Sequence, residues 1–217
     1  FEHSLLRARI RSQLRIKRLT DQLERTEHVI FMLALAVEAK DTYTEGHLRR
    51  LSSYSEQLAA ASGLSPQHVK AIRFGGLLHD IGKISIDDAI LRKSGKLTAE
   101  EYDQIKRHPE YGARIVQAMR FAAEVGPIIH HHHERWDGGG YPDGLAGEAI
   151  PIGARIVAIV DAYDAMMTDR PYRRSLGLEE TLRRLRAGRG CEWDPVLLDR
   201  FVQLIEDGAL QEPQVEQ

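Results

Sequence analysis

The stretch LLHDIGK, residues 77–83, ends an apolar segment that begins at Ser65-Pro66. Serine favours the position just before a helix and proline fits the first turn, so a helix is predicted to run from Pro66 to His79. Neighbouring side chains on a helix point in directions about 100° apart, so His79 can bind one metal ion while the two oxygens of Asp80 bridge to a second. A hydrogen-bonded pair at the helix end is the alternative, and the rest of the sequence decides between them.

The sequence on both sides of this stretch also has helical patterns. Thr98 with Glu101 three residues later forms a capping box, and Pro109 can start a further helix. Apolar spacing predicts helices at residues 47–62, 66–79, 98–107, 109–119, 122–133, 152–167, 178–187 and 194–206. We find no convincing alternating strand pattern, so the fold class is predicted to be all-α.

The N-terminal region has a pattern of its own. Residues 1–25 are strongly basic, and from residue 16 onward side chains recur with heptad-like spacing, apolar at every place but one. Two interpretations stay open: an amphipathic helix that lies on its own domain, or a connector helix that pairs with a second chain. The heptad-like positions are Ile16, Leu19, Leu23, Thr26, Ile30, Leu33 and Val37.

The composition is that of an ordinary globular protein. Its 217 residues are 42% hydrophobic with a net charge of −2, which suits one domain and gives no reason to expect binding to nucleic acid polymers or membranes. The single cysteine, Cys191, excludes an internal disulfide framework and fits a reducing compartment. The longest apolar run, residues 29–37, is too short to span a bilayer, and no signal peptide is recognised. We therefore expect a cytoplasmic protein.

Further candidate metal ligands lie on or at the ends of the predicted helices. Asp161 stands inside the apolar run IVAIVDAYDAM, where an unpaired carboxylate would be costly to bury. Each residue has an ordinary explanation by itself, such as exposure for His47 or helix capping for His108. Together, five histidines and two aspartates from different helices match the way helical bundles build dinuclear metal centres. The set is His47, His79, Asp80, His108, His132, His133 and Asp161.

The donor types indicate which metals this set prefers. Imidazole with carboxylate suits iron, manganese, nickel or zinc, and the absence of cysteine from the set argues against a structural zinc site. Two histidines of this set, His132 and His133, end a run of four in HHHHERWDGGGYPDG, residues 130–144. The run lies mid-chain and is therefore not a purification tag.

His79-Asp80 with Lys83, and the GYP sequence at residues 140–142, resemble the HD-GYP family. Its members are bacterial phosphodiesterases of the HD metallohydrolase superfamily that act on cyclic di-GMP. The resemblance covers residues 30–205 and rests on several motifs in the same order. It implies an HD-domain-like helical bundle at residues 29–210, preceded by a connector or coiled-coil helix at 1–28 and followed by a tail at 211–217.

The resemblance also implies a role for each matching residue. Asp80 would bridge two divalent metal ions, and Lys83 would contact the scissile phosphate, so these two are the expected catalytic residues. The metal ligands general to HD proteins are matched by His47, His79, Asp80 and Asp161. The ligands that HD-GYP members add for the second metal are matched by His108, His132 and His133. The expected substrate-binding residues are Lys83, Tyr141, Arg170 and Arg173.

One departure bears on the number of metal ions. Some family members hold a third metal through a glutamate four residues before the first histidine, where this chain has Tyr43, with Glu45 two positions away. We therefore expect two metal ions, with iron or manganese preferred over nickel or zinc. His130 and His131 are expected on the helix surface or behind the ligands.

The implied reaction is hydrolysis of cyclic di-GMP to pGpG, with a further cut to GMP left open. Two ions bridged by Asp80 would share a water and lower its pKa, and the resulting hydroxide would attack phosphorus. An inactive cyclic-dinucleotide receptor or scaffold, a phosphodiesterase for another cyclic dinucleotide and a general HD phosphohydrolase are the alternatives. The expected partners are the cyclic dinucleotide, a second copy bound through the N-terminal helix, and an upstream receiver-like domain.

Overall fold

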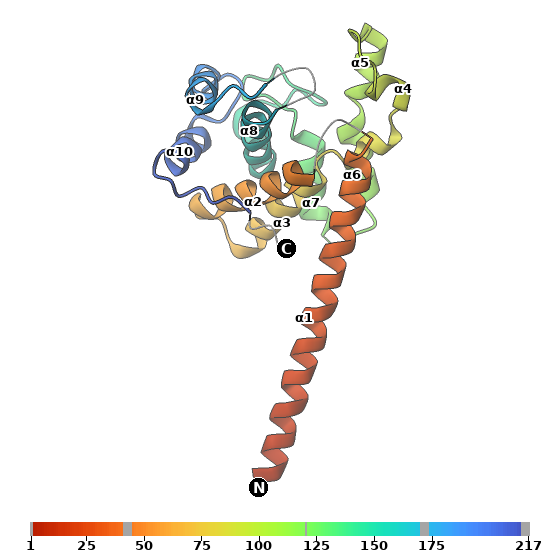
Figure 1. Cartoon of the computed structure of the whole chain (residues 1–217), viewed down its shortest axis with the longest axis vertical. Helices are drawn as coiled ribbons and strands as arrows, with labels where there is room; N and C mark the ends of the chain where they lie inside the picture. Colours follow the sequence, from red (N-terminus) through yellow and green to blue (C-terminus); the bar gives the residue numbers. More distant parts are fainter. Residues whose placement is uncertain (1, 41–44, 120, 170–173, 214–217) are drawn as a thin grey trace.

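The computed structural model describes residues 2–40, 45–119, 121–169 and 174–213 (Figure 1). Within these ranges the chain is helical without a β-strand, and its one extended pairing is an isolated bridge between Arg189 and Trp193. The predicted all-α class is thereby confirmed. The helical elements are α1 (Glu2–Glu38), α2 (Glu45–Ala61), α3 (Pro66–Leu78), η1 (Ile81–Ser85), α4 (Asp88–Leu91), α5 (Ala99–Ile105), α6 (His108–Val116), α7 (Ala122–His131), η2 (Gly147–Ala149), α8 (Ile152–Met167), α9 (Leu178–Ala187) and α10 (Pro195–Glu206).

Local capping explains why several helices begin where the sequence indicates. The Ser65 side chain accepts a hydrogen bond from the backbone of His68 at the start of α3, and Thr98 and Glu101 form a complete capping box at the start of α5. The predicted end of α7 at residue 133 is wrong by two residues. The amide of Glu134 donates to the carbonyl oxygen of His131, which closes a turn and directs the chain into the glycine-rich loop.

Two hydrophobic clusters form the core. The first joins α2, α8, α9 and α10 through residues such as Leu58, Ile156 and Phe201. The second joins the C-terminal part of α1 to α3, α6 and α7 through residues such as Ile30 and Ile129. Ile72 of α3 and Ile128 of α7 also belong to the first cluster, and Leu48 of α2 also belongs to the second. These three helices therefore contribute to both clusters and hold the domain together.

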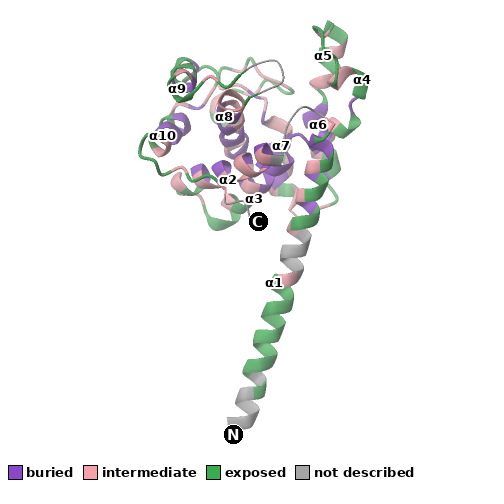
Figure 2. Cartoon of the chain, in the orientation of Figure 1, coloured by how far each residue is buried: buried purple, intermediate pink, exposed green. Residues whose placement is uncertain are grey.

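Helix α1 has two parts with different surroundings. Its 37 residues form one continuous helix whose N-terminal part extends away from the other helices (Figures 1 and 2). Apolar side chains are exposed along residues 9–20, including Ile16 and Leu19, whereas Ala34 and Val37 are buried. Residues 9–20 therefore do not lie on their own domain, which was one of the two interpretations. No described helix contains an apolar stretch long enough to cross a membrane.

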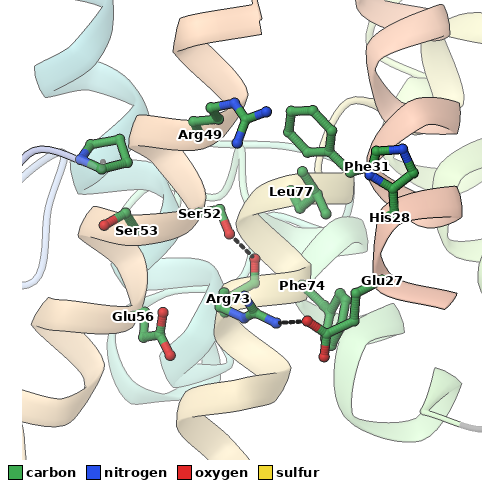
Figure 3. Close-up of a pocket in the computed structure, with 11 residues that line it drawn as sticks. Glu27, His28, Phe31, Arg49, Ser52, Ser53, Glu56, Arg73, Phe74 and Leu77 are labelled. Carbon is green, nitrogen blue, oxygen red and sulfur yellow. Dashed lines mark hydrogen bonds and ion pairs between the residues drawn. The ribbon is translucent and has the colours of Figure 1, made fainter. Parts of the chain in front are cut away.

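Ion pairs attach the middle of α1 to α3. Glu27 Oε2 lies 2.6 Å from Arg73 Nη2, and Glu27 Oε1 lies 3.2 Å from Lys70 Nζ. Arg49 of α2 stacks over the Phe31 ring (Figure 3). Apart from Lys70, these residues border a cavity of about 810 Å³ between α1, α2 and α3. None of the seven predicted metal ligands lines this cavity, so it is separate from the predicted site.

Gly82 allows a close approach between η1 and α6. A Cβ atom built at Gly82 would lie 1.9 Å from the His108 carbonyl oxygen and 2.5 Å from the Gly112 amide nitrogen. The glycine of the HDIGK stretch thus lets the backbone of η1 press against the start of α6. This contact brings Asp80, just before η1, next to His108.

Replacing Gly82 with alanine is expected to lower the free energy of unfolding by about 1–3 kcal/mol or more, because backbone atoms cannot move aside as a flexible side chain can. Urea denaturation followed by circular dichroism measures the change. Gly95→Ala is the matched control, since a Cβ atom there would meet nothing within 4 Å. Equal stability of the two variants would contradict this account of Gly82.

Candidate metal centre

The seven predicted ligands come together in two groups. In the first, the ligating atoms of Asp80, His108, His132 and His133 all lie within 4.8 Å of one another. In the second, those of His47, His79 and Asp161 do so. The side chains come from the start of α2, the end of α3, the start of α6, the end of α7 and the interior of α8. The bundle thus gathers residues from five segments that are far apart in the sequence.

Asp80 lies between the two groups. Its Oδ2 atom is 3.1 Å from His79 Nε2 in the second group, and its Oδ1 atom is 3.1 Å from His108 Nε2 in the first. His132 Nε2 is 4.0 Å from the same Oδ1. The carboxylate therefore presents one oxygen to each group, which is the geometry needed for a bridging ligand.

Hydrogen bonds on the far side of the rings fix which histidine nitrogen faces the site. Nδ1 donates to the carbonyl oxygen three residues earlier in His79, His108 and His132, at 2.9, 2.7 and 2.7 Å. A carbonyl oxygen can only accept, so in the neutral ring Nε2 has a lone pair. This arrangement is common for metal-binding histidines, because it orients the ring and makes the ligating nitrogen more basic.

The neighbouring groups set the charge of these side chains. Burial, reinforced by His133, holds the pKa of His132 well below its usual value, and burial with the influence of His108 lowers that of His133 to about 3. Burial alone would raise the pKa of Asp80, but His79 and Lys83 hold it well below its usual value. The first group therefore places a carboxylate beside the neutral imidazoles of His132 and His133.

His79 differs from the other rings. Burial disfavours its charged form, but the adjacent Asp80 outweighs burial and raises the pKa of His79 to about 9. Without a metal ion, a proton therefore holds the contact between His79 and Asp80 at neutral pH. A metal ion bound by His79 has to displace this proton.

Lys83 and Tyr141 lie at the first group. Lys83 Nζ is 2.7 Å from Asp80 Oδ2, and the Tyr141 ring stacks on His133 with ring centroids 4.8 Å apart. The loop that contains Tyr141 is tied to the end of α7. Its Tyr141 amide donates to the His133 carbonyl oxygen, and the Asp143 amide donates to Glu134 Oε1 at 2.8 Å.

Two buried carboxylates near the site were not predicted. Asp164 accepts a hydrogen bond from His47 Nδ1 at 2.7 Å and pairs with Arg50. It follows Asp161 by three residues on α8, and this spacing on one helix face was the available signal. Glu38, at the end of α1, is 2% exposed, and burial together with the charge of Asp80 raises its pKa. Nothing in the local sequence of α1 indicates that Glu38 reaches the site.

Five other residues named in the sequence analysis are not assigned to either group. Arg170, Arg173 and Tyr43 lie outside the described residues. His130 and His131 belong to neither group, and each is partly exposed with its Nε2 atom turned to Asp143.

The centre has the properties of a site for divalent metal ions. The Nε2 atoms of His108 and His132 are 3.3 Å apart, and both have lone pairs because both Nδ1 atoms donate to carbonyl oxygens. Asp161 Oδ1 is buried and has no hydrogen-bond partner among the described residues. Facing lone pairs and a buried oxygen without a donor are unfavourable by themselves and become favourable around cations. The donor set therefore fits divalent metal ions.

Comparison with known proteins agrees with this geometry. The sequence matches the HD domain family over residues 32–197. It is 43% identical over 183 residues to the cyclic di-GMP phosphodiesterase response regulator RpfG of Xanthomonas campestris pv. campestris, covering 83% of this chain and 48% of the relative. It is 37% identical over 193 residues to 3′3′-cGAMP-specific phosphodiesterase 2 of Vibrio cholerae, covering 87% of this chain and 36% of the relative. The chain thus spans less than half the length of these two relatives.

A solved structure shares the fold. The crystal structure of a cyclic GMP-AMP-specific phosphodiesterase of V. cholerae superposes with a TM-score of 0.61 at 23% identity, covering 84% of this chain and 49% of that one. The family match extends from the second half of α1 into α10, and so includes every element that supplies a ligand. The chain belongs to the HD domain family, which confirms the membership that its HD-GYP motifs predicted.

Proposed function

We propose that this chain is a metal-dependent phosphodiesterase that hydrolyses cyclic di-GMP to the linear dinucleotide pGpG. The observation that supports this most directly is the pair of histidine groups joined by Asp80, whose two oxygens face His79 and His108. Similarity to relatives named as cyclic di-GMP phosphodiesterases supports the substrate class. Other relatives are named 3′3′-cGAMP-specific phosphodiesterases, so 3′3′-cGAMP is the second candidate substrate.

The proposed centre holds two divalent ions, iron or manganese in preference to nickel or zinc. One ion is assigned to the first group and one to the second, with Asp80 shared between them. Divalent ions at such a centre supply an acidified water and neutralise negative charge on a phosphate. The protein's own part is to orient the ligands through the Nδ1 hydrogen bonds and to keep the imidazoles of His132 and His133 neutral.

Residues around the centre are assigned to the substrate. Lys83 places a positive charge beside Asp80, where the non-bridging oxygens of the scissile phosphate would gain charge in the transition state. Tyr141 forms part of the wall of the pocket against His133. Arg170 and Arg173 are proposed to hold phosphates or guanine edges, because a planar guanidinium can meet either with two hydrogen bonds.

A product assay tests the proposed reaction. The full chain is loaded with manganese, or with ferrous iron without oxygen, and cyclic di-GMP and 3′3′-cGAMP are supplied separately. Chromatography over time is expected to show pGpG from cyclic di-GMP, and later GMP would assign the second cut to this chain. Turnover of 3′3′-cGAMP alone would favour the second candidate. If the metal-loaded chain bound the cyclic dinucleotide but formed no product, the enzyme assignment would be overturned and the receptor alternative would be favoured.

Asp164 is expected to control metal affinity through His47. Replacing Asp164 with alanine removes the acceptor of the His47 Nδ1–H group and should weaken metal binding by about 10–100-fold, the usual effect of losing a partner behind a ligand. Asp164→Asn keeps an acceptor oxygen and should lose less. Competition with a chromogenic chelator measures the affinity. Unchanged affinity in both variants, with each folded by circular dichroism, would contradict the assignment.

We further infer that α1 acts as a connector up to about residue 28, with the catalytic domain at 29–210. Its exposed apolar side chains, Ile16 and Leu19 among them, are 54% and 59% exposed and suit pairing with a second copy. The relative that is named a response regulator suggests an upstream receiver-like domain as the partner in signalling. A monomer at micromolar concentration in light scattering would contradict the dimer.

A further inference from the structure

A third group of metal-ligand types lies outside the two groups of the proposed centre. His130 and His131 stand at the end of α7, and Asp143 follows Tyr141-Pro142 in the glycine-rich loop. Asp143 Oδ2 is 3.1 Å from His130 Nε2 and 3.0 Å from His131 Nε2. Two rings from the helix end thus converge on one carboxylate oxygen of the loop.

The hydrogen bonds of His131 make this convergence informative. His131 Nδ1 is 2.9 Å from the Pro127 carbonyl oxygen, which can only accept, so Nδ1 has the proton in the neutral ring. Its Nε2 then has a lone pair that faces an oxygen of Asp143. Two lone pairs at this distance repel each other unless a positive charge lies between them. His108 and His132 have the same Nδ1 hydrogen bond to a backbone carbonyl oxygen at the proposed centre.

The surroundings favour a metal ion as that positive charge. Bonds of about 2.0–2.1 Å in tetrahedral geometry place ligand atoms about 3.3–3.4 Å apart, and the two measured separations are close to this. The C-terminal end of α7 has partial negative charge, which attracts a cation. The two histidine side chains are 23% and 17% exposed and Asp143 is 51% exposed, so water can complete the coordination.

We propose that His130, His131 and Asp143 bind an additional divalent transition-metal ion, zinc or one of similar preference, at the protein surface. Two imidazoles and a carboxylate are ligands that zinc accepts, with the remaining position open to solvent. The ion would link the end of α7 to the loop that contains Tyr141. The site uses none of the seven residues assigned to the buried centre, so it does not depend on the proposed function.

This link would restrain the loop beside the buried centre. The Asp143 amide already donates to Glu134, and the Tyr141 ring stacks on His133. A metal ion on Asp143 adds a bond from the loop to the same helix end that supplies His132 and His133. Its occupancy is therefore expected to reduce the opening of residues 138–144.

Zinc stoichiometry tests the site directly. The full chain and its variants Asp143→Asn and His130→Gln are dialysed against a series of zinc concentrations, and bound metal per chain is measured by mass spectrometry. Each variant is expected to bind one zinc ion fewer than the original chain. His68→Gln is the matched control, an exposed histidine that contacts Ser65, and should bind as many ions as the original chain.

The outcomes separate this site from the buried centre. Equal zinc binding by Asp143→Asn and the original chain would overturn the proposal, and would assign a proton to the contact instead. A failure of the buried centre lowers the count equally in all the chains and leaves the difference between them intact. Hydrogen exchange of residues 138–144 should slow on zinc addition in the original chain but not in Asp143→Asn. Equal slowing in both would overturn the link to the loop.

Discussion

Replacing Asp80 with alanine is expected to remove bound metal and phosphodiesterase activity together. Asp80 is the side chain that contacts both histidine groups, with His79 on one oxygen and His108 on the other. Its loss should reduce turnover by more than about 100-fold, since even the loss of a partner behind a ligand costs about 10–100-fold. Metal content per chain and initial rates of cyclic di-GMP hydrolysis are measured on the same sample.

The control for this variant is a second aspartate that belongs to neither histidine group. Asp103→Ala changes an exposed aspartate on α5 that pairs with Lys106, and both metal content and rate should be retained. An Asp80→Ala protein that is folded and still hydrolyses the substrate at the original rate would contradict the bridging role. A protein that loses activity but keeps both metal ions would assign Asp80 to the substrate instead.

Replacing Lys83 with methionine is expected to separate catalysis from metal binding. The change keeps an unbranched side chain that is one atom shorter and removes the charge that lies 2.7 Å from Asp80 Oδ2. Removing one group that stabilises charge only in the transition state lowers kcat by about 10²–10³-fold. Metal content should be retained, because Asp80 and its histidines are unchanged.

Kinetics at saturating metal distinguish this role from a structural one. A large fall in kcat with little change in KM is expected for Lys83→Met, and Lys83→Arg should recover part of the rate by restoring the charge. Lys106→Met makes the same substitution at a partly exposed lysine that pairs with Asp103. It serves as the control, and its kcat should be close to that of the original chain. A Lys83→Met protein that loses its metal would show that Lys83 supports the ligands rather than the substrate.

The helices could be predicted because their signals are local. Ser65 and Thr98 cap the helices that follow them, and the apolar pattern of residues 152–167 needs no distant partner to be recognised as helical. The end of α7 was harder to place, because the turn after His131 depends on the loop beyond it. Helix ends are decided by the next segment as much as by the helix itself.

The ligands could be predicted to the extent that their motifs are distinctive. Asp164 was missed because a carboxylate that orients a histidine and one that binds a metal look the same in a sequence. Glu38 was missed for a different reason: its burial depends on how the end of α1 packs against the domain. The convergence of Asp143 with His130, 13 residues earlier in the sequence, likewise depends on the fold of the loop between them.

The unbroken course of α1 has a consequence for how a signal could reach the catalytic domain. At 37 residues the helix is about 55 Å long. Glu38 at its end is buried, and burial together with the charge of Asp80 raises its pKa. Such a rod transmits rotation as well as displacement. Inserting one residue between positions 9 and 20 would turn everything upstream by about 100°, whereas inserting seven would restore the original phase to within about 20°. Regulation that passes through α1 should therefore vary with a seven-residue period in the length of this segment, while the basal chemistry stays the same.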